Sequence, residues 1–388
     1  MDFTPTPEQA AARDLAARIF GDLSAPDRLA AAGTGTDAEL WKALCAAGLP
    51  GAVEEVGLLG LVLLLEEQGR TTAQVPFAVS CVYGLLAVAA HGSADQRARL
   101  LPGLRDGTEV ATGALPARGG VGRVRVEDGR LTGAVPLVPW LRDATFVLVA
   151  AADRSLWLVR TADAGCEPVE LTAPWRAGRL VLEGVRGERL GGGEDAGSGG
   201  SGSGGVGSGR GEGAGSARGP AAVVYDDVLA TARTAFAGLQ AGVCAGSLAR
   251  AVAYTNEREQ FGRPLAAKQA VQLRAAEAYM DTEAIRVTAY EAAWRRDEAL
   301  AYGTHALTAA WWASEAGRRV VHAGQHLHGG VGADVEFPVH RHFLWGRQLD
   351  AYLGCGGEVL AELGDLIATE GTAAERSATD VSATEESV

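Results

Sequence analysis

The sequence predicts an α+β fold in which an N-terminal helical domain, a small central β-domain and a C-terminal four-helix-type bundle follow one another along the chain. Three observations support this prediction. Apolar residues recur at helical spacing over roughly the first 110 residues, which is typical of helices packed on one face. Short alternating segments separated by turn residues come next and are typical of strands. After Asp226, long apolar stripes at steps of three and four indicate the helices of a bundle.

The first predicted domain, residues 1–109, is helical. Thr36-Asp37 stands ahead of an apolar repeat and provides a helix N-cap signal. Pro102 and Gly103 are residue types that interrupt helices, so we expect the last helix to end there. The four predicted helices run over residues 8–20, 37–47, 54–68 and 94–104.

The second predicted domain, residues 110–186, consists of short strands. Residues 123–126 alternate in polarity and are expected to form a strand. Asp128-Gly129 is a two-residue hairpin signal, and residues 130–135 are expected to form the returning strand of the hairpin. Residues 187–220 follow and are rich in Gly and Ser; they cannot bury enough apolar surface to offset the entropy of ordering, which predicts a flexible insert. The further strands are expected over residues 146–150, 155–160 and 179–182.

The third predicted domain, residues 221–368, is the helical bundle, and residues 369–388 are expected to form a disordered tail. Its first helix is predicted to end near Phe261-Gly262, before Pro264. We expect two later helices to bury one apolar stripe each. The first stripe is Leu273, Ala276, Met280, Ala284, Val287, Tyr290 and Trp294, and the second is Ala309, Trp312, Ala316, Val320, Ala323 and Leu327.

Composition excludes several classes of function. The formal net charge of −13 makes nucleic acid an unexpected partner, because phosphate binding needs clustered Lys and Arg. The sequence contains no uninterrupted apolar run of about 18 residues, so we expect no membrane span. The N-terminal segment lacks the features of a secretion signal. Five scattered cysteines form neither a disulfide pattern nor a metal cluster, so we expect a cytoplasmic protein with no metal site.

Two segments in the last third are the most specific features. One is Arg258-Glu-Gln-Phe-Gly-Arg-Pro264 followed by Gln269, and the other is His326-Leu-His-Gly-Gly-Val-Gly332. With the helical stretches 41–48 and 66–70, they resemble the acyl-CoA dehydrogenase family, whose C-terminal bundle carries an R-x-x-F-G…Q segment and a Q-x-x-G-G-x-G segment. The resemblance spans the whole chain except the insert and the tail. It departs at His326, where the family usually has Gln.

The resemblance implies FAD as the cofactor, bound across a subunit interface. In this interpretation Arg258 holds the pyrophosphate with its planar guanidinium, and two glycines let the backbone approach the ligand closely. Taken singly, each residue has a simpler structural explanation, such as a solvated charge, a core ring or a helix C-cap. The residues assigned to the cofactor are Arg258, Phe261, Gln269, His326, Gly329 and Gly330.

The family's reaction is the α,β-desaturation of an acyl-CoA thioester, in which a carboxylate removes the α-proton and a hydride passes to the flavin. The usual glutamate lies in a Y-E-G-T-like stretch, and we place Cys355 at its position and expect a buried, inert thiol. The alternative base region, residues 229–234, contains no carboxylate. Glu358, one helical turn beyond Cys355, is the remaining candidate, although a helix-end charge explains it more simply.

Two further segments depart from the family. Residues 115–122 lack the hydroxyls of the family's flavin-facing T-E-P-x-x-G-S-D strip, leaving Thr112 as the nearest hydroxyl, and residues 53–58 are a shortened glycine loop. Three hypotheses therefore stay open. The chain is an active acyl-CoA dehydrogenase with an unrecognised base, or a non-catalytic subunit that pairs with a paralogue, or an enzyme that oxidises a substrate without CoA on the same fold. The resemblance implies a homo-oligomer or hetero-oligomer in each case.

Overall fold

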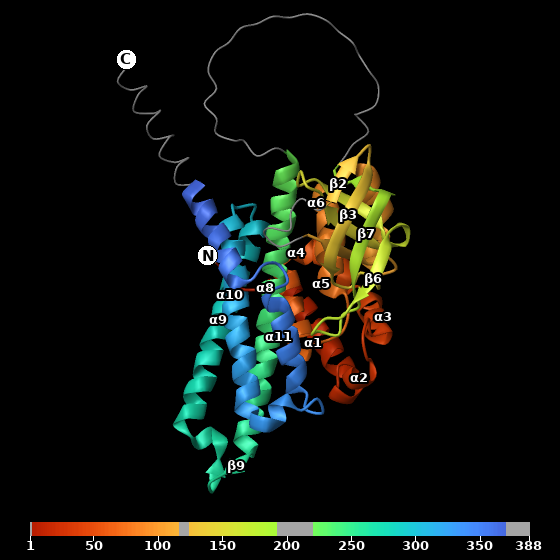
Figure 1. Ribbon diagram of the computed structural model, residues 1–388. Helices are drawn as coiled ribbons and strands as arrows, with labels where there is room; N and C mark the ends of the chain where they lie inside the picture. The colour runs from red at the N-terminus through yellow and green to blue at the C-terminus, as the bar shows by residue number, and fades with distance from the viewer. Residues whose placement is uncertain (1, 116–123, 192–219, 370–388) are drawn as a thin grey trace, which may run out of the picture.

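The computed structural model describes residues 2–115, 124–191 and 220–369 of the chain. Figure 1 shows the N-terminal helices and the β-domain on one side of the long central helix α8, and α9 and α10 on its opposite side. The predicted fold class is thereby confirmed. The change from helices to strands falls between Asp106 and Ala111, and the bundle begins at Pro220.

The N-terminal helices begin and end at ordinary capping signals. The Asp37 carboxylate accepts a hydrogen bond from the Leu40 N–H at 3.1 Å and caps α3, as predicted. The predicted end at Pro102 was wrong, because α7 continues through this proline and ends at the left-handed Gly107. The elements are α1 (Pro7–Leu23), α2 (Pro26–Ala31), α3 (Ala38–Ala46), α4 (Leu49–Thr71), α5 (Phe77–Val79), the π-helical η1 (Ser80–Leu86), α6 (Ala87–His91) and α7 (Ala94–Asp106).

The helical stretch 77–91 was not predicted. Residues 77–88 are buried on every side, so their apolar residues show no helical period. A helix enclosed in this way cannot be distinguished from a buried strand by periodicity alone.

The β-domain is a pair of four-stranded sheets. One has the order β1 (Ala111–Ala114), β4 (Phe146–Ala150), β5 (Leu156–Arg160) and β8 (Glu188–Arg189); β1 and β4 are parallel. The other has the antiparallel order β2 (Val124–Glu127), β3 (Arg130–Val138), β7 (Ala177–Arg186) and β6 (Gly165–Val169). The predicted hairpin joins β2 to β3, with positive φ at Asp128 and Gly129 as a type I′ turn requires. A separate apolar cluster that includes Leu131, Val147 and Leu180 fills this domain.

The bundle contains α8 (Pro220–Glu257), α9 (Gln269–Asp297), α10 (Gly303–His328), α11 (Val339–Asp350) and a helix over residues 356–369. A short hairpin of β9 (Glu259–Gln260) and β10 (Arg263–Pro264), followed by η3 (Leu265–Ala267), joins α8 to α9, and η4 (Gly329–Ala333) follows α10. Among the described residues, Ala221–Glu257 is long and apolar enough to cross a membrane, and α3 with α4 passes the same test as a bent pair. Most of α8 is buried against α4, α9 and α10, as expected of a core helix.

Glycines allow α8 to lie against α4. Gly238, Gly242 and Gly246 recur every fourth residue on one face of α8. A Cβ on Gly242 would lie 2.1 Å from the Glu66 carbonyl oxygen, and one on Gly69 of α4 would lie 2.2 Å from the Leu239 carbonyl oxygen. The two backbones are therefore too close for any side chain at these positions.

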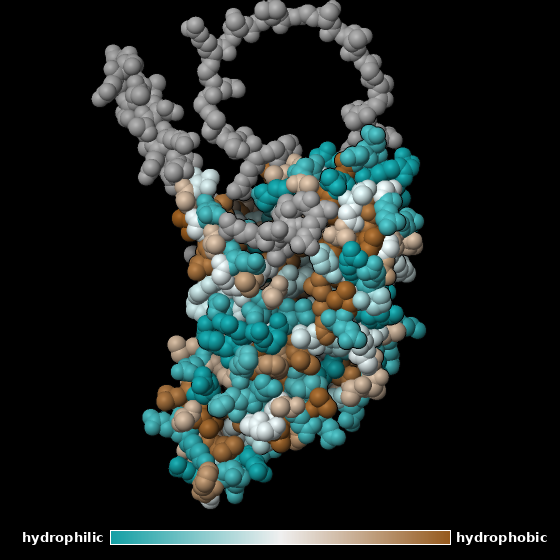
Figure 2. Space-filling model, in the orientation of Figure 1, coloured by the Kyte–Doolittle hydropathy of each residue, from teal (hydrophilic) through white to brown (hydrophobic). Residues whose placement is uncertain are grey.

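The predicted orientation of α9 was wrong. Leu273, Met280 and Val287 are 57%, 69% and 52% exposed, whereas Ile285 and Ala289 are buried in the bundle. Apart from Ile285, the buried face of α9 consists of small residues, namely Ala278, Thr282, Ala289, Ala292 and Ala293, and the larger apolar residues of the predicted stripe lie outside. Figure 2 shows hydrophobic residues at the lower left of the molecule, where α9 and the β9 hairpin lie in Figure 1. The stripe predicted for α10 is confirmed at Ala309, Ala316, Val320, Ala323 and Leu327.

Candidate functional site

The two specific segments meet at one end of the bundle. Arg258 follows α8 and donates its backbone N–H to the Tyr254 carbonyl at 2.8 Å. The Tyr254 ring stacks on His328, with centroids 4.7 Å apart, and His328 directly precedes Gly329. The β9 hairpin and the turn between α10 and α11 lie at the same end in Figure 1. Segments about 70 residues apart in sequence are thus neighbours in space.

This end of the bundle is open. Phe261 occupies the hairpin tip with φ of 56° and is 91% exposed, with the Lys268 ammonium 4.2 Å from its ring centre. Arg258, Gln269, His326, Gly329 and Gly330 are exposed as well. The six residues that the sequence assigned to the cofactor are therefore exposed on the surface.

The six exposed residues fit a dinucleotide. Gly329 has φ of 63°, which favours glycine, and a Cβ built on Gly329 or Gly330 would meet no atom within 4 Å. Space for a ligand therefore lies directly above the backbone. Within the described ranges the Arg258 side chain has neither an ion pair nor a hydrogen bond, so its guanidinium is available for an anion. FAD bound here would be held by Arg258 and by the backbone of the two glycines.

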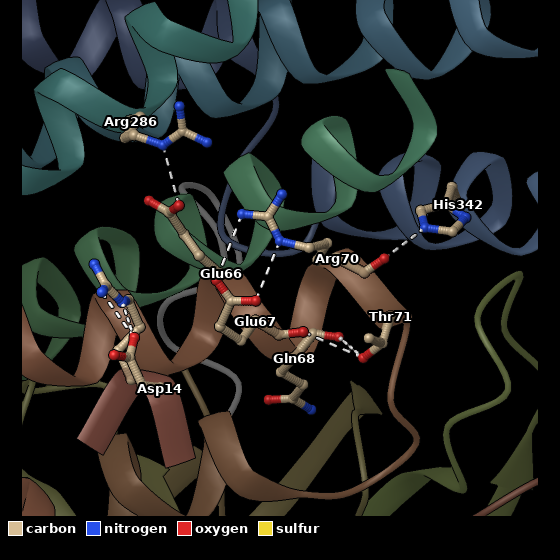
Figure 3. A network of polar contacts seen from close by, with 9 residues as sticks. Asp14, Glu66, Glu67, Gln68, Arg70, Thr71, Arg286 and His342 are labelled. Atoms are coloured by element: carbon tan, nitrogen blue, oxygen red, sulfur yellow. Dashed lines mark hydrogen bonds and ion pairs between the residues drawn. The ribbon is translucent and has the colours of Figure 1, made fainter. Parts of the chain in front are cut away.

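The Glu66–Arg70 stretch, which contributed to the resemblance, has a structural role. Figure 3 shows Glu66 of α4 paired with Arg286 of α9, with Arg286 Nε 3.0 Å from Glu66 Oε2. Burial raises the pKa of Glu66, while the Arg286 guanidinium acts in the opposite direction. The Arg70 carbonyl oxygen lies 3.0 Å from His342 Nε2 of α11. The stretch therefore joins the N-terminal domain to two bundle helices.

The base region corrects the sequence prediction. Matching the Tyr and Gly of the family's Y-E-G-T stretch to Tyr352 and Gly354 puts Leu353, not Cys355, at the glutamate position. Leu353 is buried and Cys355 is exposed, so the expectation of a buried thiol was wrong. Glu358 Oε2 accepts the Cys355 backbone N–H at 3.2 Å, which is a capping contact at a helix N-terminus.

The alternative base region holds a cation. Arg233 of α8 is buried and makes two hydrogen bonds to Glu362, both 2.8 Å long, and a weaker one of 3.4 Å to the Leu353 carbonyl oxygen. A carboxylate held in a bidentate pair stays ionised and has little capacity to take a substrate proton. Sequence inspection of residues 229–234 sought only carboxylates and so missed the partner, which lies 129 positions away.

Aromatic side chains fill the space beside Leu353. Tyr83 of η1 and Tyr352 meet through their hydroxyl oxygens at 3.1 Å, and the Phe236 ring lies 4.7 Å from that of Tyr352. Burial raises the pKa of both tyrosines, so both stay neutral. One cavity next to Leu353, lined also by Arg233 and Phe236, measures about 20 Å³, room for one water molecule.

Tryptophans close the junction between the β-domain and the bundle. Trp140 at the end of β3 stacks on Trp175 at 6.1 Å, and Trp175 meets Trp345 of α11 edge-to-face at 5.2 Å. All three are buried. Thr112, the nearest hydroxyl in the predicted flavin-facing region, donates its hydroxyl to the Pro139 carbonyl oxygen at 2.6 Å. Residues 116–122 of the strip that departs from the family lie outside the described residues.

No group of three or more His, Cys, Asp or Glu side chains with metal-binding geometry occurs in the described part of the chain. The five cysteines are all free thiols.

Comparison with known proteins defines the family. Residues 6–108 match the acyl-CoA dehydrogenase N-terminal domain, and residues 222–362 match the acyl-CoA dehydrogenase C-terminal domain. The chain is also 33% identical over 356 residues to acyl-CoA dehydrogenase FadE27 of Mycobacterium tuberculosis, an alignment that covers 84% of this chain and 87% of the relative. The chain belongs to the acyl-CoA dehydrogenase family of flavoprotein oxidoreductases.

Two solved structures are similar over nearly the whole chain. A variant of the Tcur3481–Tcur3483 steroid ACAD is 38% identical, with a TM-score of 0.81 over 94% of this chain and 99% of that one. The ChsE4–ChsE5 complex of Mycobacterium tuberculosis is 29% identical, with a TM-score of 0.82 over 95% and 99%. Butyryl-CoA dehydrogenase of Megasphaera elsdenii shares the fold at 20% identity, with a TM-score of 0.77 over 95% and 100%.

Proposed function

We propose that this chain is the non-catalytic subunit of a heteromeric acyl-CoA dehydrogenase and contributes half of an FAD site to a paralogous catalytic subunit. One observation carries the proposal: Leu353, which the Tyr-x-Gly match puts at the position of the family's base, is buried next to the cluster of Tyr83, Phe236 and Tyr352. A hydrocarbon side chain cannot accept an α-proton.

The dinucleotide half-site supports the same proposal. Arg258, Gly329 and Gly330 keep the chemistry for binding a pyrophosphate and lie open on the surface. A chain that had lost both catalysis and cofactor binding would have no need of an arginine without an ion-pair partner among the described residues, next to two exposed glycines. When bound, FAD supplies the hydride acceptor, and this chain's residues position its phosphates at the subunit interface.

The substrate is proposed from the relatives. The 38%-identical structure is a steroid acyl-CoA dehydrogenase made of two proteins, and the 29%-identical structure is a complex of two proteins. We propose a bulky, steroid-like acyl-CoA as the substrate and a paralogous family member as the partner. The exposed apolar residues of α9, which include Met280, offer a surface for such a partner.

An anaerobic titration tests the proposal. The chain is purified alone and after co-expression with a paralogous subunit, and each sample receives a steroid acyl-CoA while the flavin absorbance is recorded. We expect bleaching only in the complex, and Arg258→Gln should lower the flavin content of that complex. Arg318→Gln, at an exposed arginine of α10, is the matched control and should leave the flavin content unchanged. Bleaching by the chain alone would show an active enzyme with another base. Bleaching by a substrate without CoA would favour the third hypothesis.

A further inference from the structure

Arg250 of α8 is a half-buried cation that has no counterion in the described part of the chain. Positions 246, 250 and 254 lie one turn apart on one face of the helix. A Cβ on Gly246 would lie 2.5 Å from His342 Nε2, and the Tyr254 ring stacks on His328. Arg250 therefore lies between two histidines, at the end of the bundle that carries the two exposed glycines.

Within the described residues Arg250 has no carboxylate partner and no side-chain hydrogen bond. Burial alone lowers its pKa. Arg341 of α11 also has no carboxylate partner in the described ranges, but it is satisfied by neutral acceptors, including Gln74 Oε1 at 3.0 Å and the Leu29 carbonyl oxygen at 3.4 Å. Taking a guanidinium partly out of water without a partner costs stability, so Arg250 calls for an anion that the described residues do not supply.

His328 is a neutral neighbour of Arg250 and supplies no negative charge. Its Nδ1 lies 2.7 Å from the Gly324 carbonyl oxygen, which fixes the proton on that nitrogen and leaves Nε2 without a partner among the described residues. Burial, and then the Arg250 charge, lower the pKa of His328. The imidazole thus stays neutral beside Arg250 and does not compete for its anion.

We propose that Arg250 is a second phosphate-binding arginine of the shared dinucleotide site. Arg250 precedes Arg258 by two helical turns, roughly 12 Å along the helix axis. Two long arginine side chains can reach one pyrophosphate across that separation. The inference rests on the proposed function, because it takes FAD at the cradle of Gly329 and Gly330 as its ligand.

Flavin binding tests this role. The flavin-free complex with the paralogous subunit is titrated with FAD, with ADP and with riboflavin, for the wild type, Arg250→Gln and Arg250→Lys. We expect Arg250→Gln to weaken FAD and ADP roughly 10- to 100-fold and riboflavin not at all, because only the first two carry the pyrophosphate. The salt dependence of FAD binding should also become shallower, while Arg250→Lys should restore part of the affinity.

Thermal unfolding of the flavin-free chain separates ligand binding from a structural role. Arg250→Gln removes an uncompensated charge and should leave the Tm unchanged or higher, whereas Arg341→Gln breaks satisfied hydrogen bonds and should lower it. The inference is overturned if Arg250→Gln lowers the Tm as Arg341→Gln does, or if it leaves FAD affinity intact. It is also overturned if the variant loses only assembly with the partner, which would identify the anion as a carboxylate of that subunit. Failure of the wild-type complex to bind FAD would instead reject the proposed function.

Discussion

The contact between α4 and α8 gives the sharpest test of the fold. Gly242→Ala adds one methyl group whose carbon would lie 2.1 Å from the Glu66 carbonyl oxygen and within 2.8 Å of two further backbone atoms of the same residue. Real Cβ atoms do not approach backbone this closely, and backbone in the middle of two packed helices cannot rotate away. The helices must therefore separate along their shared face.

The magnitude follows from two opposing terms. Overpacking a well-filled interior costs typically 1–3 kcal/mol, and a rigid backbone contact belongs at the upper end, about 3 kcal/mol. Alanine recovers about 1 kcal/mol in helix propensity over glycine. The expected net loss in the free energy of unfolding is therefore about 2 kcal/mol.

Urea unfolding followed by far-ultraviolet circular dichroism measures this loss, with Gly21→Ala as the matched control. Gly21 lies on the exposed face of α1, and its added methyl would meet nothing within 4 Å, so only the propensity term applies. We expect the control to gain up to about 1 kcal/mol. If both variants shift the transition in the same direction, the close approach of α4 and α8 is refuted.

Three more predictions concern buried polar groups. Burial lowers the pKa of His342 from 6.5 to about 4, so between these pH values the unfolded chain binds a proton that the folded chain does not. The free energy of unfolding should therefore fall by roughly 3 kcal/mol as the pH drops from 6.5 to 4. In denaturation curves measured across this range, His342→Gln should make the free energy of unfolding depend less on pH. The Asp297 carboxylate accepts two backbone N–H groups of α4 at 2.8 and 2.9 Å, so Asp297→Ala should cost about 1–3 kcal/mol, and an unchanged melting temperature would contradict this capping role. Iodoacetamide should alkylate Cys355 in the folded protein but Cys81 only after denaturation, because one thiol is exposed and the other buried; peptide mass spectrometry of the two states checks this order.

Local patterns predicted most of the elements correctly. The Asp37 cap, the Asp128-Gly129 hairpin and strand 146–150 depend on neighbours within a few residues, so the sequence contains all that is needed to locate them. Prediction failed where the environment is uniform, as in helix 77–91, which is enclosed on every side. It also failed at Pro102, where the helix continues as part of a packed interface.

In the candidate site, too, some residues could be located from the sequence and others could not. The motif residues Arg258 and Gly329 could be located from the order of residues alone, because the family's spacing is local to each segment. The Arg233–Glu362 pair and the Tyr83–Tyr352 contact could not, since each joins residues far apart in the chain. The aromatic cluster beside Leu353 is therefore a property of packing.

By itself, the sequence determined the family, the order of the helical and β segments and the positions of the two motif segments, because each depends on short-range spacing or composition. The tertiary structure decided which face of α9 is exposed, that Leu353 is buried next to an aromatic cluster and that Arg250 has no counterion among the described residues. Burial and charge compensation depend on every neighbour in space, and most of those neighbours come from distant parts of the chain.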